Sequence, residues 1–275
     1  MIRFGAHPGL VAYVTCGDPN LATSREVILA AIDAGADVIE IGVPFSDPLA
    51  DGPIIQRASQ RAVDAGVTLD DVLQLAADVR RARAQAGLII FSYFNPILHY
   101  GLKKFCDQAK QAGINGALVT DLTLEEADDY RALMKAHKLA TIFLAAPTST
   151  DTRLRKIAAA SQGFIYAVSR TGVTGPNRSS DTKGDAERLV KRLRKFSKLP
   201  IAVGFGISSP EDFRSVGEFA DAVVIGSAIV RIIEESAKSG ALPAQTAEAV
   251  SKWIKSLREG SGSVQAVRRA RVELS

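Results

Sequence analysis

Two carboxylates, Glu40 and Asp51, stand eleven positions apart in contrasting local sequences. Glu40 interrupts the apolar run 37–42, which is typical of a strand buried on both faces. An unpaired carboxylate in such a strand is costly to bury or has a raised pKa. Asp51 lies in a loop rich in proline and glycine, where we expect solvent and backbone donors to keep it ionised. The pair suits general acid–base chemistry, because one group would hold a proton and the other a charge.

Purely structural roles explain the same two residues. Glu40 could pair with a basic group at the end of its strand. Asp51 could cap the helix that Pro53 starts, because Asp favours the cap and Pro the first helical position. These two residues alone leave both interpretations open, so the surrounding elements must decide between them.

Short apolar segments recur along the chain, each followed by a loop and a stretch of helical periodicity. This alternation is typical of βα units with a parallel sheet. The expected strands are 10–15, 37–42, 88–93, 116–120, 140–145, 164–168, 201–204 and 222–226. The expected helices are 21–34, 54–64, 69–86, 101–112, 124–137, 150–160, 183–197, 210–217, 228–239 and 244–257. Eight units in about 250 residues predict an α/β fold, a single (β/α)8 TIM barrel with extra helices.

An open doubly wound sheet is the rival architecture. Its Gly-x-Gly-x-x-Gly turn is absent after the first expected strand, which continues into Cys16-Gly-Asp-Pro19 instead. We therefore predict one catalytic barrel domain over residues 1–260. The stretch 259–263 is typical of a linker, so residues 261–275 are expected to form a flexible basic C-terminal tail.

Composition excludes several classes of protein. The 275 residues are 47% hydrophobic and contain no apolar run long enough to cross a membrane, and we expect a cytoplasmic protein. Two cysteines and three scattered histidines lack the spacing of a metal site. The basic runs 191–195 and 268–271 carry no interleaved aromatic residues, so we expect no binding of nucleic acid.

Glycine clusters follow the last three expected strands, at 169–175, 204–210 and 226–228. In a barrel these loops share the C-terminal rim, where the last two commonly form a phosphate site with a helix N-terminus. Ser227 would add a hydroxyl donor to the backbone amides. The three clusters together predict a phosphate-binding end.

The same rule places Glu40 and Asp51 at that rim, because one ends the second strand and the other follows it. Tyr13, Tyr93 and Tyr166 could reach the same cavity, although an aromatic residue in a strand is more often part of the core. An acid, a base and a phosphate site indicate proton transfer on a phosphorylated small molecule.

Over nearly its whole length the chain resembles the α subunit of tryptophan synthase. The resemblance is carried, in order, by the segments 13–19, 40–53, 169–175, 204–209 and 226–227. It implies a barrel that cleaves indole-3-glycerol phosphate to indole and glyceraldehyde 3-phosphate. It also implies an α2β2 assembly in which indole passes to a β subunit that uses pyridoxal phosphate, with no metal or cofactor in this chain.

The resemblance assigns roles to individual residues. Glu40 matches the acid/base, and Asp51 matches the carboxylate that holds the indole NH and stabilises its developing positive charge. The residues that match the family's phosphate site are Gly175, Gly206, Gly226 and Ser227. Tyr166 matches a residue beside Glu40, and Tyr13 and Tyr93 match residues along the indole pocket. Thr174 matches a residue of a lid that closes onto Asp51.

Two other functions remain open for a chain with these segments. Pro44, Asp47, Asn95 and Pro96 match positions that face the β subunit, but they could equally serve loop structure. The chain could then be a stand-alone lyase that releases free indole. It could also be a barrel that activates a β subunit and has little activity of its own.

Overall fold

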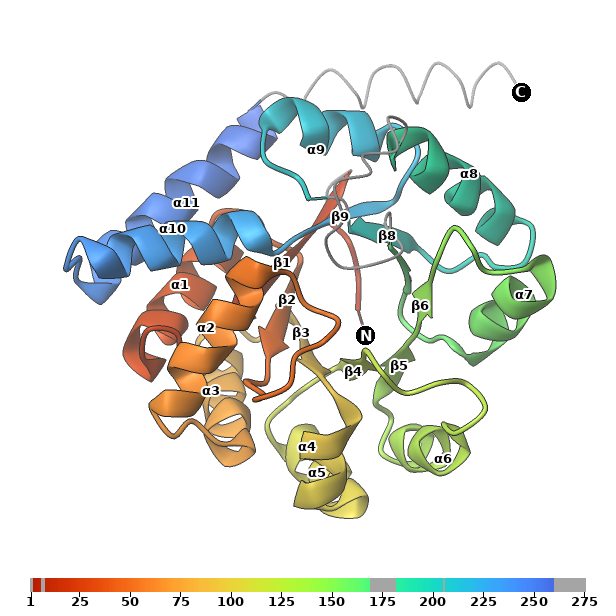
Figure 1. Ribbon diagram of the computed structural model, residues 1–275, viewed down its shortest axis with the longest axis horizontal. Coiled ribbons are helices and arrows are strands. Elements are labelled where there is room, and N and C mark those ends of the chain that lie inside the picture. The colour runs from red at the N-terminus through yellow and green to blue at the C-terminus, as the bar shows by residue number, and fades with distance from the viewer. Residues whose placement is uncertain (1, 6–7, 169–181, 205, 260–275) are drawn as a thin grey trace.

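The computed structural model describes residues 2–5, 8–168, 182–204 and 206–259. Parallel strands form a ring that helices surround (Figure 1). The strands are β1 (Gly9–Thr15), β2 (Val38–Gly42), β3 (Gly87–Ser92), β4 (Gly116–Val119), β5 (Ala140–Ile142), β6 (Leu144–Ala145), β7 (Ile165–Val168), β8 (Ile201–Gly204) and β9 (Ala222–Ile225). The predicted tail, residues 261–275, lies outside the described part of the chain.

The order of the strands is β5-β4-β3-β2-β1-β9-β8-β7-β6, so β5 and β6 stand at the two ends of the sheet. These two strands are halves of one expected strand, separated only at Phe143. The first half pairs with β4 and the second with β7. One continuous segment therefore bridges both ends of the sheet, which leaves eight strand positions and confirms the predicted barrel.

Helices follow the strands almost as expected. They are α1 (Leu21–Asp33), α2 (Pro53–Asp64), α3 (Leu69–Ala82), α4 (Phe94–Tyr100), α5 (Leu102–Gln111), α6 (Asp128–Ala136), α7 (Asp151–Ala160), α8 (Thr182–Arg194), α9 (Pro210–Gly217), α10 (Ser227–Lys238) and α11 (Pro243–Glu259). Helix α4 was not predicted, because seven residues are too few to show helical periodicity. Helix α6 begins at Asp128 rather than 124, since turns occupy 124–126.

Alternate side chains of each strand point into the barrel, and the others face the helices. On β2, Ile39 and Ile41 belong to the large apolar cluster under the helices, whereas Val38 belongs to a smaller cluster inside the barrel. Glu40 is two residues beyond Val38, so it points inward as well. The inner cluster forms an apolar floor beneath Glu40.

This floor includes the start of the chain. Ile2 is buried in the inner cluster, and the Phe4 ring meets the Phe164 ring edge to face at 5.9 Å. Phe164 directly precedes β7 and is fully buried. The N-terminal segment therefore covers the end of the barrel opposite the rim.

We predict that Phe164→Ala lowers the free energy of unfolding by about 3–5 kcal/mol, because it leaves a cavity in the inner cluster. Denaturant titration followed by circular dichroism measures this change. Leu242→Ala is the control, since that side chain is 66% exposed and its loss should change stability by less than about 0.5 kcal/mol. Equal effects of the two substitutions would show that Phe164 does not anchor the floor.

Candidate active site

Glu40 is almost completely buried, with 1% of its surface exposed. Its Oε1 atom has no hydrogen-bond partner among the described residues. Burial raises the pKa of Glu40 to about 8, so the carboxyl group is mostly protonated at neutral pH. The structural role considered for Glu40, an ion pair with a basic residue, is absent from the described part of the chain.

The expectation that solvent and backbone donors keep Asp51 ionised is wrong in its reason. Asp51 is only 7% exposed, and its Oδ2 accepts a hydrogen bond of 3.0 Å from the Tyr93 hydroxyl. Burial raises the pKa of Asp51 to about 6, and the hydrogen bond from Tyr93 opposes this rise. Asp51 is still mostly ionised at pH 7, so the two carboxyl groups do differ in protonation state.

Asp51 is not the cap of helix α2. The residue at the cap is Gly52, and no side chain donates or accepts a capping hydrogen bond there. The backbone carbonyl of Asp51 instead accepts a hydrogen bond of 3.0 Å from the Gln56 side chain. The carboxylate is thereby left available to the cavity.

Both carboxyl groups line one cavity of about 600 Å³ at the rim of the barrel. The cavity also contains the inward-facing residues Tyr13, Phe91 and Tyr166. Tyr93, predicted to lie along the indole pocket, reaches the cavity only through Asp51. Its hydroxyl donates to Asp51 and accepts from the Ala50 backbone at 2.8 Å, so it orients the carboxylate instead.

The two cavity tyrosines lie over glycines of neighbouring strands. A Cβ atom on Gly42 would lie 2.4 Å from the Tyr13 hydroxyl oxygen, and one on Gly204 would lie 2.6 Å from that of Tyr166. Both rings therefore need a residue without a side chain beside them. Burial raises the pKa of each tyrosine, so both remain neutral and supply apolar ring surface at the cavity wall.

The predicted phosphate end is far from Asp51 in the sequence but lines the same cavity. Gly206, Gly226 and Ser227 all line it. Gly226 caps α10 without a side-chain hydrogen bond, and Ser227 is the first helical residue, so free backbone amides face the cavity. Thr174 and Gly175 lie outside the described residues.

Sequence reasoning missed Arg231, which also lines the cavity. It stands one helical turn after Ser227, and this spacing of four on an expected helix was the available signal. Arg231 is the one cationic side chain lining the cavity within the described ranges. Its charge complements the phosphate group expected at this end.

Two classes of feature are absent from the part of the chain that the structure describes. None of its helices combines the length and apolar character that crossing a bilayer requires. No group of three or more His, Cys, Asp or Glu side chains among the same residues is arranged to hold a metal ion.

The family model for the tryptophan synthase alpha chain matches residues 4–259. The chain belongs to this family. The tryptophan synthase alpha chain of Solibacter usitatus (strain Ellin6076) is 46% identical over 254 residues, which are 92% of each chain. The solved tryptophan synthase subunit alpha of Legionella pneumophila str. Paris superposes with a TM-score of 0.83 at 34% identity, covering 93% of both chains.

Membership of the tryptophan synthase alpha chain family confirms the predicted enzyme class. The chain is a lyase of tryptophan biosynthesis, and the family reaction is cleavage of indole-3-glycerol phosphate. The stand-alone lyase and the weakly active β-activating barrel are not favoured by this result. The (β/α)8 fold is shared with the solved relatives.

We predict that Glu40→Gln stabilises the fold, and that the gain grows with pH. The pKa of Glu40 is about 8 in the folded state and about 4.5, its ordinary value, in the unfolded state. Between these pH values the unfolded state ionises more readily, so Glu40 lowers stability increasingly with pH and reaches its full effect above pH 8. The gain should be small near pH 4.5 and reach about 1–4 kcal/mol above pH 8. Thermal and denaturant unfolding across this range measure it.

The exposed Glu235→Gln variant, on α10, is the matched control and should leave stability nearly unchanged at every pH. A Glu40→Gln gain that does not vary with pH would mean that Glu40 ionises normally in the folded protein.

Proposed function

We propose that Glu40 is the acid and base of indole-3-glycerol phosphate cleavage and that Asp51 anchors the indole nitrogen. The observation that carries this proposal is the contrast within one cavity. Glu40 is buried and mostly protonated near pH 7, whereas Asp51 is mostly ionised and oriented by Tyr93. One group can therefore donate a proton while the other stabilises a cation.

The reaction is a retro-aldol cleavage whose atoms balance without a further reactant. Glu40 donates its proton to C3 of the indole ring, which leaves positive charge at the ring nitrogen. Asp51 accepts a hydrogen bond from the indole NH and stabilises that charge. The bond from C3 to the glycerol carbon then breaks as the hydroxyl on that carbon returns a proton to Glu40. The products are indole and glyceraldehyde 3-phosphate.

The phosphate binds at the far end of the cavity. Backbone amides at Gly206, Gly226 and Ser227 are the proposed donors, with the Ser227 hydroxyl and the Arg231 guanidinium. Gly175 and the Thr174 lid belong to the same proposal on the strength of the family resemblance. Tyr13 and Tyr166 enclose the indole end with Phe91.

The reaction uses only protein side chains and backbone amides. We therefore propose that this chain works without a cofactor or metal of its own, and that pyridoxal phosphate belongs to a β subunit alone. A cytoplasmic location, expected from the sequence, is part of the same proposal.

We predict a bell-shaped pH dependence of kcat/KM for cleavage, with a maximum near pH 7. Activity should fall below about pH 6 as Asp51 gains a proton, and above about pH 8 as Glu40 loses one.

Glu40→Gln should be nearly inactive, and Asp51→Asn should lose about 10²–10³-fold in kcat. Indole release from the purified chain measures these rates.

Tyr93→Phe separates the two limbs of this profile. Its hydroxyl lowers the pKa of Asp51, so its removal should move the acid limb to higher pH and leave the alkaline limb in place. Near wild-type rates in both the Glu40→Gln and Asp51→Asn variants would refute the assigned roles.

We propose that the chain binds a β subunit through the rim beside the cavity. A solved tryptophan synthase complex from Pyrococcus furiosus contains a chain that superposes with a TM-score of 0.81 at 32% identity, covering 92% of this chain and 98% of that one. On this chain, Leu49 is 78% exposed after β2 and Leu98 is 56% exposed after β3. Exposed leucines on adjacent rim segments suit a protein interface.

The residues matched to that interface divide by exposure. Asp47 and Asn95 are exposed and Pro96 is half-buried, so they are available to a partner. Pro44 is buried in this chain, which favours the alternative that it serves loop structure. An α2β2 assembly that passes indole between subunits is the proposed arrangement.

We predict that Leu98→Glu abolishes co-purification with a β subunit, because a charge replaces an apolar contact, while the isolated chain keeps its cleavage rate. Leu242→Glu is the matched control, since Leu242 is similarly exposed and lies between α10 and α11. Loss of the complex in both variants, or in neither, would contradict the proposed location of the interface.

A further inference from the structure

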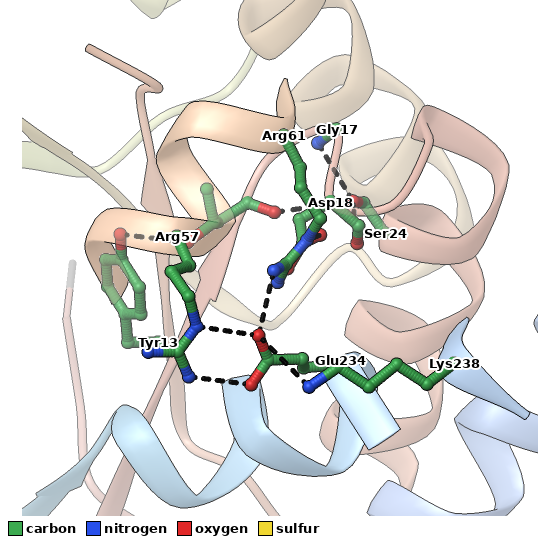
Figure 2. A network of polar contacts seen from close by, with 9 residues as sticks. Tyr13, Gly17, Asp18, Ser24, Arg57, Arg61, Glu234 and Lys238 are labelled. Carbon is green, nitrogen blue, oxygen red and sulfur yellow. Dashed lines mark hydrogen bonds and ion pairs between the residues drawn. The ribbon is translucent and has the colours of Figure 1, made fainter. Parts of the chain in front are cut away.

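An ionic cluster with two buried carboxylates joins three segments near the cavity (Figure 2). Arg61 of α2 holds Asp18 through two hydrogen bonds of 2.7 and 2.9 Å and reaches Glu234 of α10 at 3.0 Å. Arg57, one turn earlier on α2, donates two hydrogen bonds of 2.8 Å to the same Glu234 carboxylate. Asp18 is 1% exposed and Glu234 6%. Two nearly buried carboxylates from distant segments thus meet one arginine.

Helix α2 carries the loop that contains Asp51. Gln56 donates to the Asp51 carbonyl at 3.0 Å, just after the start of α2. Ser59 exchanges two hydrogen bonds with the backbone of Phe45, at 2.8 and 2.9 Å. Both ends of the loop are therefore fastened to α2, so the position of Asp51 follows the position of this helix.

Helix α10 carries the phosphate end in the same way. It starts at Ser227, whose backbone lines the cavity, and Glu234 follows two turns later. Helices α2 and α10 lie side by side (Figure 1). The bonds from Arg57 and Arg61 to Glu234 thus connect the carrier of the indole anchor to the carrier of the phosphate site.

The cluster also includes the turn after β1, the strand that contributes Tyr13 to the cavity lining. Asp18 lies in the turn after β1, and Ser24 fixes this turn by accepting from Gly17 N at 2.9 Å. In the same segment the Thr15 hydroxyl donates to the Tyr13 hydroxyl at 3.2 Å. Arg61 is the one residue of the cluster that contacts both buried carboxylates.

We propose that Arg61 is a positioning residue that sets the distance between the indole anchor Asp51 and the phosphate site at Ser227. This inference rests on the proposed function of the cavity. A guanidinium suits the role, because its planar fork holds two carboxylates in fixed directions. Lysine would keep the charge and lose that geometry. Arg61 itself touches no reacting atom.

A residue that sets a distance has a distinctive signature. Ligands that occupy only one end of the cavity do not sense the span, whereas a ligand that occupies both ends does. Indole probes one end, and glycerol 3-phosphate probes the other. An indole joined to a phosphate by a saturated three-carbon chain spans both ends and is not cleaved. Calorimetry or inhibition of cleavage measures the affinity of each.

In Arg61→Gln we expect both single-end ligands to bind within about twofold of wild type, while the two-ended analogue binds at least about tenfold more weakly and kcat/KM falls by a similar factor. Arg61→Lys should show a smaller loss in the same pattern. Equal weakening of all three ligands, or unchanged binding of the two-ended analogue, would overturn the proposal.

Arg258→Gln is the matched control at the other end of the barrel. Arg258 donates hydrogen bonds to Asp37 at 2.9 Å and to the carbonyls of Pro8 and Gly35. Like Arg61 it makes several hydrogen bonds, and its side chain is only 17% exposed. It should lower stability without changing the binding of any of the three ligands. If Arg61→Gln does not fold, Glu234→Gln tests the same link, because it removes the charge that Arg57 and Arg61 share.

The proposed function and this inference fail in different ways. Cleavage of indole-3-glycerol phosphate by the wild-type chain tests the function alone. The comparison of one-ended with two-ended ligands, in Arg61 variants against wild type, tests the positioning role alone.

Discussion

Burial of the Glu40 carboxyl group inside the barrel is the interaction on which the account of this protein depends. A parallel strand covered on both faces gives the carboxyl group little contact with solvent, and its Oε1 has no hydrogen-bond partner among the described residues. The resulting preference for the neutral form lowers stability at every pH at which the unfolded chain would ionise this group. The same preference keeps a proton available beside the cavity at neutral pH. Stability is thus exchanged for an acid.

The barrel turns this local property into a site. Because all strands are parallel, their carboxyl ends share one rim, and loops from distant parts of the chain meet there. Glu40 lies on a strand, Asp51 lies on the loop that follows it, and the proposed phosphate end lies at the start of α10. Rigid strands hold the acid, whereas ionic contacts between helices hold the loop and the phosphate end relative to each other. The position of each group therefore has an identifiable structural origin.

Much of this arrangement was predictable from the sequence because it is encoded locally. Alternation of apolar strands and amphipathic helices predicted the barrel. The position of Glu40 within an apolar strand predicted a buried carboxyl group with a raised pKa. The short helix α4 was missed, since seven residues carry too little periodicity. The division of the fifth strand at Phe143 was missed because it depends on pairing with two different neighbours.

The environment of Asp51 depends on contacts across the chain and could not be read locally. Its loop composition indicates exposure, yet Tyr93 and the cavity walls bury it. The cluster of Asp18, Arg61 and Glu234 likewise joins residues up to 216 positions apart, from Asp18 to Glu234, and no spacing in the sequence reveals it. Tertiary contacts, rather than residue types, determine these features.

The most direct test of the account is a titration of the Glu40 carboxyl carbon by NMR. Protein labelled with ¹³C in glutamate side chains would be compared with the Glu40→Gln variant, whose missing signal assigns the resonance. We expect a pKa of about 8 for this carboxyl group in the folded chain. A value near 4.5, the ordinary one for a glutamate, would contradict it.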